Sequence, residues 1–253
     1  MKYSLKLFWK QKKQYIADIF EAKVHEKFRG FIHHDKAKCN NCRKCIELCP
    51  VGAINSDYSV DLGKCQFCNE CVLNCREKAL SFSNFHHTAA TSREALVIPS
   101  GMTEEEFAAK AIEVKEEIVR IFGRSLKLRN VSAGGCNGCE LELNATGNVN
   151  FDIGRYGIDI VASPRHADGV IVTGPMSENM AFALENTLKA VPDPKIIILM
   201  GSCAISGGVF AESSAINREF LKNKDIALYI PGCPAHPLTV AVGILNILGR
   251  KSK

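Results

Sequence analysis

Twelve cysteines stand out in this chain of 253 residues, and eight of them fall into two runs with the same spacing. Each run reads C-x-x-C-x-x-C-x-x-x-C, one starting at Cys39 and the other at Cys65, so the second repeats the first at an offset of 26 residues. Only the first run is followed by proline, Pro50, since Arg76 follows the second. Soft thiolates in a tight loop suit iron, and this spacing is typical of segments that bind two cubane 4Fe–4S clusters.

The fourth cysteine of each run is expected to leave its own loop and to ligate the cluster of the other run. The predicted ligand sets are therefore Cys39, Cys42, Cys45 and Cys75 for the first cluster and Cys65, Cys68, Cys71 and Cys49 for the second. A pair of zinc sites is the alternative, because C-x-x-C pairs also bind zinc. Zinc would leave the third cysteine and the distant fourth of each run without a purpose, so we favour iron–sulfur clusters.

The other four cysteines each follow a short apolar run that predicts a β-strand. They are Cys136 and Cys139 after the first such strand, Cys203 after a later one and Cys233 after the last. Ligands of open parallel sheets gather beyond the carboxyl ends of the strands, so we expect three loops to bring these thiolates together. Four thiolates by themselves suit either zinc or a 4Fe–4S cluster. The two clusters predicted nearby favour a third cluster, because it would extend a path for electrons, and the predicted cofactors are thus three 4Fe–4S clusters.

The elements that must position these cysteines are predicted from hydrophobic periodicity. Thr103 and Glu106 form a capping box that opens a helix over 103–122. Beyond it, β-branched runs alternate with helical stretches, which is typical of a parallel sheet covered by helices on both faces. The predicted strands are 126–131, 158–161, 169–173, 195–200 and 226–230, and the predicted helices are 178–190 and 237–249.

These patterns divide the chain into four segments. Residues 1–30 are predicted as a basic, amphipathic N-terminal arm, in which the apolar residues of 3–20 have helical spacing. Its apolar face suits the chain's own domain, a partner protein or a membrane surface. Residues 31–84 are predicted as a two-cluster, ferredoxin-like α+β domain, and 85–102 as a linker. Residues 103–250 are predicted as a flavodoxin-like α/β domain with a parallel sheet and one cluster.

Composition narrows the class of protein. The first residues have neither the apolar core nor the cleavage site of a signal peptide, so we expect a reducing compartment, where many cysteines indicate metal rather than disulfides. No stretch has the roughly 20 apolar residues that a membrane-spanning helix needs. Residues 1–38 carry ten Lys or Arg and four acids. Such a basic arm fits a protein partner or anionic lipid better than nucleic acid.

Four motifs in the second half of the chain resemble one family. They are 135–142 (GCNGCELE), 163–168 (SPRHAD) with 173–174 (TG), 201–203 (GSC) with 207–208 (GG), and 231–234 (PGCP). In this order they resemble the small subunit of complex-I-like, membrane-bound nickel–iron hydrogenases of the formate hydrogenlyase and energy-converting type. The same family includes the 20 kDa subunit of complex I, which usually has adjacent cysteines where two residues here separate Cys136 from Cys139. The N-terminal part is similar to the two-cluster ferredoxin subunit of these complexes.

The resemblance implies that the third cluster is the last relay before the active site of a separate large subunit. All twelve cysteines are already assigned, so no catalytic residue is predicted in this chain. Arg165 and His166 are predicted to lie near the third cluster, where a cation favours the reduced form and a histidine can couple proton uptake to reduction. A surface or interface position is the alternative for both. Glu142 is a candidate for proton movement, with a capping or interface role as its alternative.

The leading hypothesis is an electron-transferring small subunit of a membrane-bound nickel–iron hydrogenase complex. Its predicted partners are a hydrogenase-like large subunit, ion-translocating membrane subunits and a donor such as ferredoxin or a formate or CO dehydrogenase; nucleic acid is not among them. Its predicted location is the cytoplasmic side, peripheral on the inner face of the cell membrane. One alternative is the same relay in a complex-I-like NADH or ferredoxin oxidoreductase that reduces quinone or a sulfur compound. A sensing module with structural clusters is another.

Overall fold

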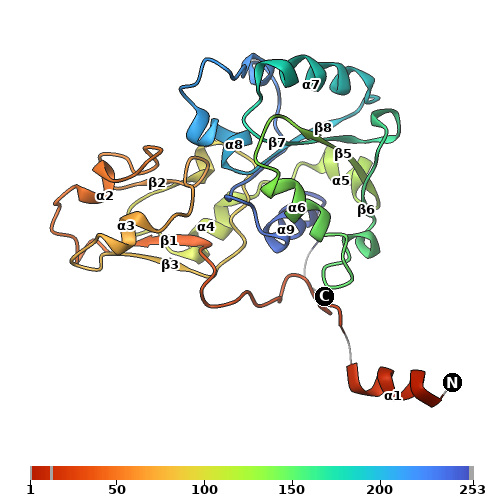
Figure 1. Ribbon diagram of the computed structural model, residues 1–253, viewed down its shortest axis with the longest axis horizontal. Coiled ribbons are helices and arrows are strands. Elements are labelled where there is room, and N and C mark those ends of the chain that lie inside the picture. Colours follow the sequence, from red (N-terminus) through yellow and green to blue (C-terminus); the bar gives the residue numbers. More distant parts are fainter. Residues whose placement is uncertain (1, 12–13, 251–253) are drawn as a thin grey trace.

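The computed structural model describes residues 2–11 and 14–250. The chain folds into two parts that lie side by side (Figure 1). Residues 31–84 form the smaller part, and a five-stranded sheet with its helices forms the larger part. Every pair of neighbouring strands in that sheet is parallel. The mixed α/β fold class predicted from the sequence is therefore confirmed.

The smaller part repeats its backbone as well as its cysteines. Strand β1 (Phe31–His34) pairs antiparallel with β3 (Leu80–Ser83). Each cysteine run carries one short helix, α2 (Lys44–Glu47) in the first and α3 (Glu70–Leu73) in the second. The two helices begin 26 residues apart, at the same point of the two runs. The sequence repeat is therefore also a structural repeat.

The larger part is built on a sheet of strand order β6-β5-β7-β8-β9. Its strands are β5 (Leu126–Ser132), β6 (Ile158–Ile160), β7 (Gly169–Thr173), β8 (Ile196–Met200) and β9 (Leu228–Ile230). Strands β7 and β8 are buried along their whole length, and successive side chains of each point to opposite faces. A strand buried on both faces has a continuous apolar sequence. All five predicted strands agree with the observed ones within two residues at each end.

Helices cover both faces of the sheet. Helices α7 (Glu178–Ala190) and α8 (Ser202–Ser206) pack on the face that also meets the smaller part. Helices α5 (Glu116–Phe122), α6 (Gly138–Ala145) and α9 (Pro237–Ile247) pack on the other face. Single 3-10 turns lie between these elements: η2 (Ile153–Tyr156), η3 (Pro164–His166), η4 (Gly208–Phe210) and η5 (Glu219–Leu221).

The helix predicted over 103–122 is interrupted. Its first half is α4 (Glu104–Ala111), which begins at the predicted capping box of Thr103. Beyond α4 the chain is extended, because the amide of Thr91 donates a hydrogen bond of 2.9 Å to the carbonyl of Ala111. The helix resumes as α5. A tertiary hydrogen bond thus breaks a helix that periodicity alone would continue.

The segment predicted as a linker, 85–102, is hydrogen-bonded to both parts. It contains η1 (Glu94–Leu96) and strand β4 (Val97–Ile98), which pairs antiparallel with β2 (Val60–Asp61) of the smaller part. Ala90 and Tyr229 of β9 exchange both of their backbone hydrogen bonds, at 2.9 and 2.8 Å. This segment therefore extends one edge of the large sheet while it completes a small sheet in the other part.

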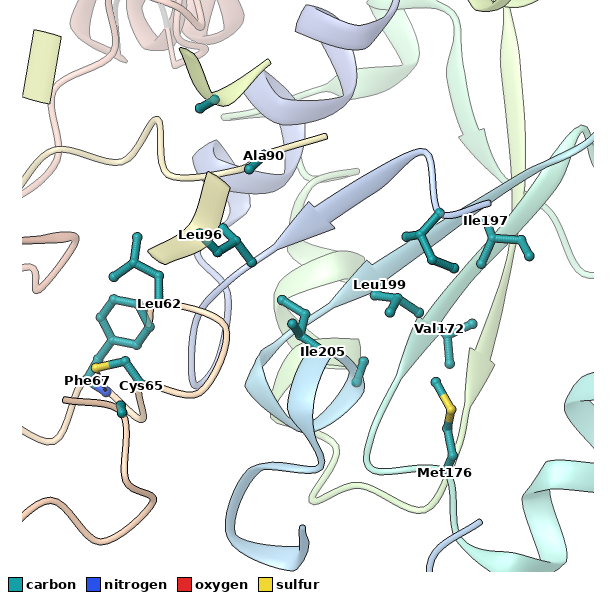
Figure 2. Packing of buried hydrophobic residues seen from close by; sticks show 14 of the residues in the cluster. Leu62, Cys65, Phe67, Ala90, Leu96, Val172, Met176, Ile197, Leu199 and Ile205 are labelled. Atoms are coloured by element: carbon teal, nitrogen blue, oxygen red, sulfur yellow. Dashed lines mark hydrogen bonds between the residues drawn. The ribbon is translucent and has the colours of Figure 1, made fainter. Parts of the chain in front are cut away.

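One apolar core continues across the junction of the two parts. Figure 2 shows Leu62 and Phe67 of the smaller part on one side and Leu96 of the linking segment next to them. The same core goes on through Ile205 of α8 to Leu199 of β8. All five side chains are buried. Burial of apolar surface at the junction favours one fixed arrangement of the cysteine-bearing loops.

The N-terminal arm differs from the helix predicted over 3–20. Helix α1 (Lys2–Gln11) is shorter, and residues 1, 12 and 13 of the predicted arm lie outside the described residues. Ile19 is fully buried against the core beneath α9, and the amide of Ile16 donates to the carbonyl of Asn150 at 2.9 Å. Packing on the larger part therefore decides the conformation of this stretch. No helix among the described residues is long and apolar enough to span a bilayer.

An ion pair holds the linking segment to the smaller part. The guanidinium of Arg93 donates two hydrogen bonds to the carboxylate of Asp61, at 2.8 and 2.6 Å, and the Asp61 side chain is only 8% exposed. Replacing one partner of a buried pair leaves an uncompensated charge, which costs about 3 kcal/mol. We expect Arg93→Met to lower the midpoint of thermal unfolding by roughly 6–12 °C for a chain of this size. Circular dichroism at one fixed scan rate measures this, and Arg120→Met, on the exposed side of α5, should change the midpoint by far less.

Candidate iron–sulfur centres

The first predicted cysteine set lines one pocket of the smaller part, with a volume of about 170 Å³. Cys39, Cys42 and Cys45 come from the first run, and Cys75 comes from the end of the second run. The amide of Ala79 donates a hydrogen bond to Cys75 Sγ at 3.3 Å. Hydrogen bonds to a ligand sulfur stabilise the thiolate form that binds metal. Four sulfurs from both repeats thus surround one space.

The second predicted set lies around a narrower pocket, of about 20 Å³. Cys65, Cys68 and Cys71 come from the second run, and Cys49 comes from the first. The amide of Ala53 donates to Cys49 Sγ at 3.2 Å, which is the equivalent of the bond to sulfur in the other repeat. Burial raises the pKa of the Cys65 and Cys71 thiols to about 12. At neutral pH these thiols keep their protons unless a metal takes the place of the proton.

The third predicted set lies at the carboxyl edge of the large sheet. Cys136 and Cys139 stand at the start of α6, Cys203 lies in α8, and Cys233 follows β9. Burial raises the pKa of the Cys139 thiol to about 12, and the neighbouring charges that add to this effect include Cys203 and Cys233. Burial likewise raises the pKa of Cys203 to about 11, with contributions from Cys233 and Cys136. The four thiols thus affect one another's pKa, although they come from three loops.

One C-x-x-C stretch in each set has the same backbone conformation. The residue after its first cysteine is in the left-handed region: Arg43 with φ 61°, Asn69 with φ 76° and Asn137 with φ 69°. A helix begins at the next residue in all three cases. The first cysteine therefore precedes the helix and the second lies in its first turn, where backbone amides have no partner within the helix. The third set thus repeats, on a different fold, the local geometry of the first two.

Each of the three sets fits the ligand requirement of one 4Fe–4S cluster, which is four cysteine thiolates. At the first set the pocket volume agrees with this, whereas at the second set the fit depends on the donors, because the pocket is narrow. Within residues 2–11 and 14–250, no three His, Cys, Asp or Glu side chains gather closely enough to hold a single metal ion.

The three sets follow one another through the molecule. Burial is the main cause of the raised pKa of Cys71 in the second set, and Cys45 of the first set adds to it. Burial is also the main cause of the raised pKa of Cys233 in the third set, and Cys68 of the second set contributes. The second set is therefore the one that interacts with both of the others.

A buried hydroxyl joins the loops of the second and third sets. Ser202 Oγ donates a hydrogen bond of 2.6 Å to the carbonyl of Cys65, and the carbonyl of Gly232 lies 3.2 Å from the same oxygen. Ser202 is 1% exposed and precedes Cys203 directly. One side chain thus links a loop of the smaller part to two cysteine loops of the larger part.

Known proteins match both parts of the chain. Residues 136–247 match a family described as the NADH ubiquinone oxidoreductase 20 Kd subunit, and 31–54 match a 4Fe-4S binding domain. The first match contains all four cysteines of the third set. A probable membrane-bound hydrogenase subunit mbhJ of Pyrococcus furiosus is 34% identical over 137 residues, which cover 54% of this chain and 82% of that protein. This chain belongs to the 20 kDa subunit family.

Two further members of the family show its range. An NADH-quinone oxidoreductase subunit of Heliobacterium modesticaldum is 36% identical over 152 residues, which cover 59% of this chain and 86% of that protein. Formate hydrogenlyase subunit 7 of Escherichia coli is 38% identical over 157 residues. These cover 62% of this chain and 60% of that protein, so the match spans less than two thirds of its length. The family resemblance predicted from the cysteine motifs is confirmed, and these relatives are subunits of oxidoreductases.

Arg165 and His166, predicted near the third set, lie in η3 and are exposed. They come just before Gly169, which pairs with Leu128 in the sheet, whereas the cysteines follow the opposite end of the strands. The remaining four residues of β7 span roughly 13 Å. The structure therefore does not bring these two side chains to the third cysteine set.

Glu142 lies close to the third set. It lines a pocket of about 270 Å³ together with Cys233, Arg29 and His236. Burial raises the pKa of the Glu142 carboxyl. Glu142 thus presents, from α6, a partly enclosed carboxyl beside one of the cysteine loops.

Two polar residues within the matched segment 136–247 were not identified as part of the site from the sequence motifs. Glu140 is buried and accepts a hydrogen bond of 2.6 Å from Thr173 Oγ1, next to Cys139. Its place directly after a cysteine was a signal that could have drawn attention to it. Arg218 donates to the carbonyl of Cys203 at 3.1 Å. No motif surrounds Arg218, so only the fold reveals its position.

Gly201 has no side chain, and the sulfur of Cys139 lies close to where the Cβ atom of a larger residue would be. A Cβ atom at Gly201 would lie 2.4 Å from Cys139 Sγ, and φ is +88° there. We expect Gly201→Ala to displace this sulfur. If the three predicted clusters are bound, the iron content of purified protein should then fall from about twelve towards about eight atoms per chain. Iron analysis and EPR of anaerobically purified protein measure this.

Gly52 offers a matched control for that variant. Its φ is +56°, but nothing lies within 4 Å of a Cβ built on it. Gly52→Ala therefore adds left-handed strain without a clash, and we expect it to cost about 1–2 kcal/mol of stability and no iron. Full iron content and an unchanged EPR spectrum in Gly201→Ala would contradict the predicted role of Gly201.

Proposed function

We propose that this chain is the electron-transfer subunit of a membrane-bound nickel–iron hydrogenase complex. In this proposal it relays electrons through three 4Fe–4S clusters between a donor and the active site of a partner large subunit. The observation that carries the proposal is the series of three four-cysteine sets, which runs from the smaller part to the carboxyl edge of the parallel sheet. Membership of the 20 kDa subunit family supports it.

The cysteines proposed as ligands are the three sets described above. Bound there, a 4Fe–4S cluster supplies reversible uptake of one electron. The chain's own residues hold the sulfurs in place: backbone amides donate to Cys49 and Cys75, and Ser202 joins the second and third loops. The shared core across the junction keeps the two parts at a fixed distance, and this favours a constant rate of electron transfer between them.

The third set is proposed as the contact with the large subunit. Cys136 and Cys233 are exposed in the chain alone. Leu141, shortly after Cys139, and Val209 with Phe210, shortly after Cys203, are exposed large apolar residues. Apolar side chains of this kind near a polar site are typical of a protein interface. A large subunit over this edge would cover the exposed cysteines.

The other proposed partners are ion-translocating membrane subunits and a donor such as ferredoxin or a formate or CO dehydrogenase. The relative from Pyrococcus furiosus is described as a subunit of a membrane-bound hydrogenase, and this supports a peripheral place on the inner face of the cell membrane. In this proposal the smaller part, which carries the first set, receives electrons from the donor.

A complex-I-like oxidoreductase is the second candidate. The relative from Heliobacterium modesticaldum, which belongs to an NADH-quinone oxidoreductase, is matched over 86% of its length. In that case the same relay would end at a site that reduces quinone or a sulfur compound. The two residues between Cys136 and Cys139 favour the hydrogenase proposal.

The test is metal analysis of the native complex, purified anaerobically without added metal and captured through a tag on this chain. We expect about twelve iron atoms per copy of this chain beyond those of its partners, no stoichiometric zinc, and three low-potential EPR signals assigned to it. Nickel in the large subunit supports the hydrogenase proposal, and its absence together with quinone reduction supports the second candidate. Zinc in place of iron would overturn both.

A further inference from the structure

Arg218 reaches the third cysteine set from the segment between Cys203 and Cys233. All four hydrogen bonds that its guanidinium makes within the described part of the chain go to backbone carbonyls. The acceptors are the carbonyls of Cys203 at 3.1 Å, Ala204 at 2.9 Å, Ile205 at 2.9 Å and Pro175 at 3.4 Å. Three of these carbonyls belong to α8, the short helix that carries Cys203.

The charge of Arg218 is partly withdrawn from solvent and lies close to Cys203. Burial lowers the pKa of Arg218, and Cys203 acts in the opposite direction. Burial raises the pKa of Cys203, and Arg218 opposes that effect. A cation in such surroundings requires compensating negative charge. The carbonyl dipoles at the end of α8 supply part of it, and a metal-bound thiolate at Cys203 would supply a full charge.

We propose that the fixed positive charge of Arg218 raises the reduction potential of the third cluster. This inference rests on the proposed function, because it requires a 4Fe–4S cluster on the third cysteine set. Reduction adds one electron, and therefore one negative charge, to that cluster. A cation held beside a ligand stabilises the reduced state more than the oxidised state. The rigid, five-donor fork of arginine holds the charge in one place, which a flexible lysine does less well.

A purely structural role for Arg218 is the competing explanation. Three of the same four hydrogen bonds fasten α8 to the segment that precedes η5, and the fourth joins that segment to Pro175. In that case the loss of the guanidinium would lower the amount of cluster bound or the thermal stability, and the potential of any remaining cluster would stay the same. The potential therefore separates the two roles.

Arg165 is the matched control. It carries the same charge, and it was predicted from the sequence to lie near the third cluster. It is exposed and precedes β7, whereas the third cysteine set lies beyond the carboxyl end of the sheet. The same substitution at Arg218 and at Arg165 thus compares two arginines that differ in their distance from Cys203.

The experiment is an EPR-monitored redox titration of the anaerobically purified holoprotein in wild-type form and as Arg218→Gln, Arg218→Lys and Arg165→Gln. The third-cluster signal is identified as the one absent from Cys139→Ser. We expect Arg218→Gln to weaken the preference for the reduced form at least tenfold, which lowers a one-electron potential by about 59 mV. Arg218→Lys should lower it by less, and Arg165→Gln should leave it unchanged.

Equal potentials in wild-type protein and Arg218→Gln would overturn the inference, as would an equal shift in Arg165→Gln. If Arg218→Gln binds no third cluster, Arg218→Lys decides: a potential lowered by less than tenfold supports the inference, and an unchanged potential or a tenfold or larger loss overturns it. If neither variant at Arg218 holds the cluster, the role is structural and the inference fails. A wild-type protein without any third signal contradicts the proposed function instead, so the two failures are distinguishable.

Discussion

Replacing Cys139 by serine should stop electron transfer out of this chain. Cys139 is the member of the third set that lies against both Gly201 and the amide of Ala235, and in the proposed function its loss removes one of the four ligands of the third cluster. We expect iron to fall from about twelve to about eight atoms per chain. Turnover of the complex should fall by roughly 100-fold or more, because even the loss of residues that only support metal ligands costs 10–100-fold.

The measurement combines iron analysis, EPR and turnover of the tagged complex with a reduced donor. In Cys139→Ser, dithionite should still reduce the first two clusters, which shows that the donor end remains intact. Cys42→Ser is the reciprocal control: it should lose the first cluster and keep the third-cluster signal. A Cys139→Ser complex with full iron content and normal turnover would show that the third set holds no relay.

Replacing Cys75 should remove the first cluster, although Cys75 belongs to the second cysteine run. The pocket lined by Cys39, Cys42 and Cys45 also contains Cys75, whereas Cys49 lines the pocket of the other run. If each run bound its own cluster, Cys75→Ser would instead remove the second one. The loss of one ligand of four should abolish or strongly reduce the EPR signal of the affected cluster.

Comparison of spectra decides between these two arrangements. The EPR spectrum of Cys75→Ser should match that of Cys42→Ser, and the spectrum of Cys49→Ser should match that of Cys68→Ser. The reverse pairing would show that the runs are not interlocked. Because all four variants replace cysteine by serine in the same small part of the chain, differences in side-chain chemistry cancel.

The linking segment gives the relay a fixed geometry in the proposed function. It contributes β4 to the smaller part, bridges Tyr229 in the larger part and forms the ion pair between Arg93 and Asp61. Electron transfer between centres depends steeply on their separation. A segment that ties both parts together would therefore hold the second and third cysteine sets at one distance.

Local patterns made much of this protein predictable from its sequence. The repeat of two cysteine runs, the capping box at Thr103 and the apolar strands predicted over 169–173 and 195–200 depend on neighbours in the chain or on burial of both faces. All of them recur in the structure, the last strand one residue shorter than predicted. The sequence also predicted the position of Cys203 at the carboxyl edge of the sheet, because the loops at the carboxyl ends of parallel strands meet there. Side-chain type and spacing were sufficient in these cases.

Only the tertiary structure decided which distant groups meet. The hydroxyl of Ser202 meets the carbonyl of Cys65 across 137 residues of sequence, and Thr91 interrupts a helix in another segment. Arg218, rather than Arg165, lies beside Cys203. Arg165 stands in the SPRHAD motif and Arg218 stands in no motif, but a motif does not decide whether a long side chain points to solvent or into the protein. Packing between the two parts makes that choice, and packing depends on the whole chain at once.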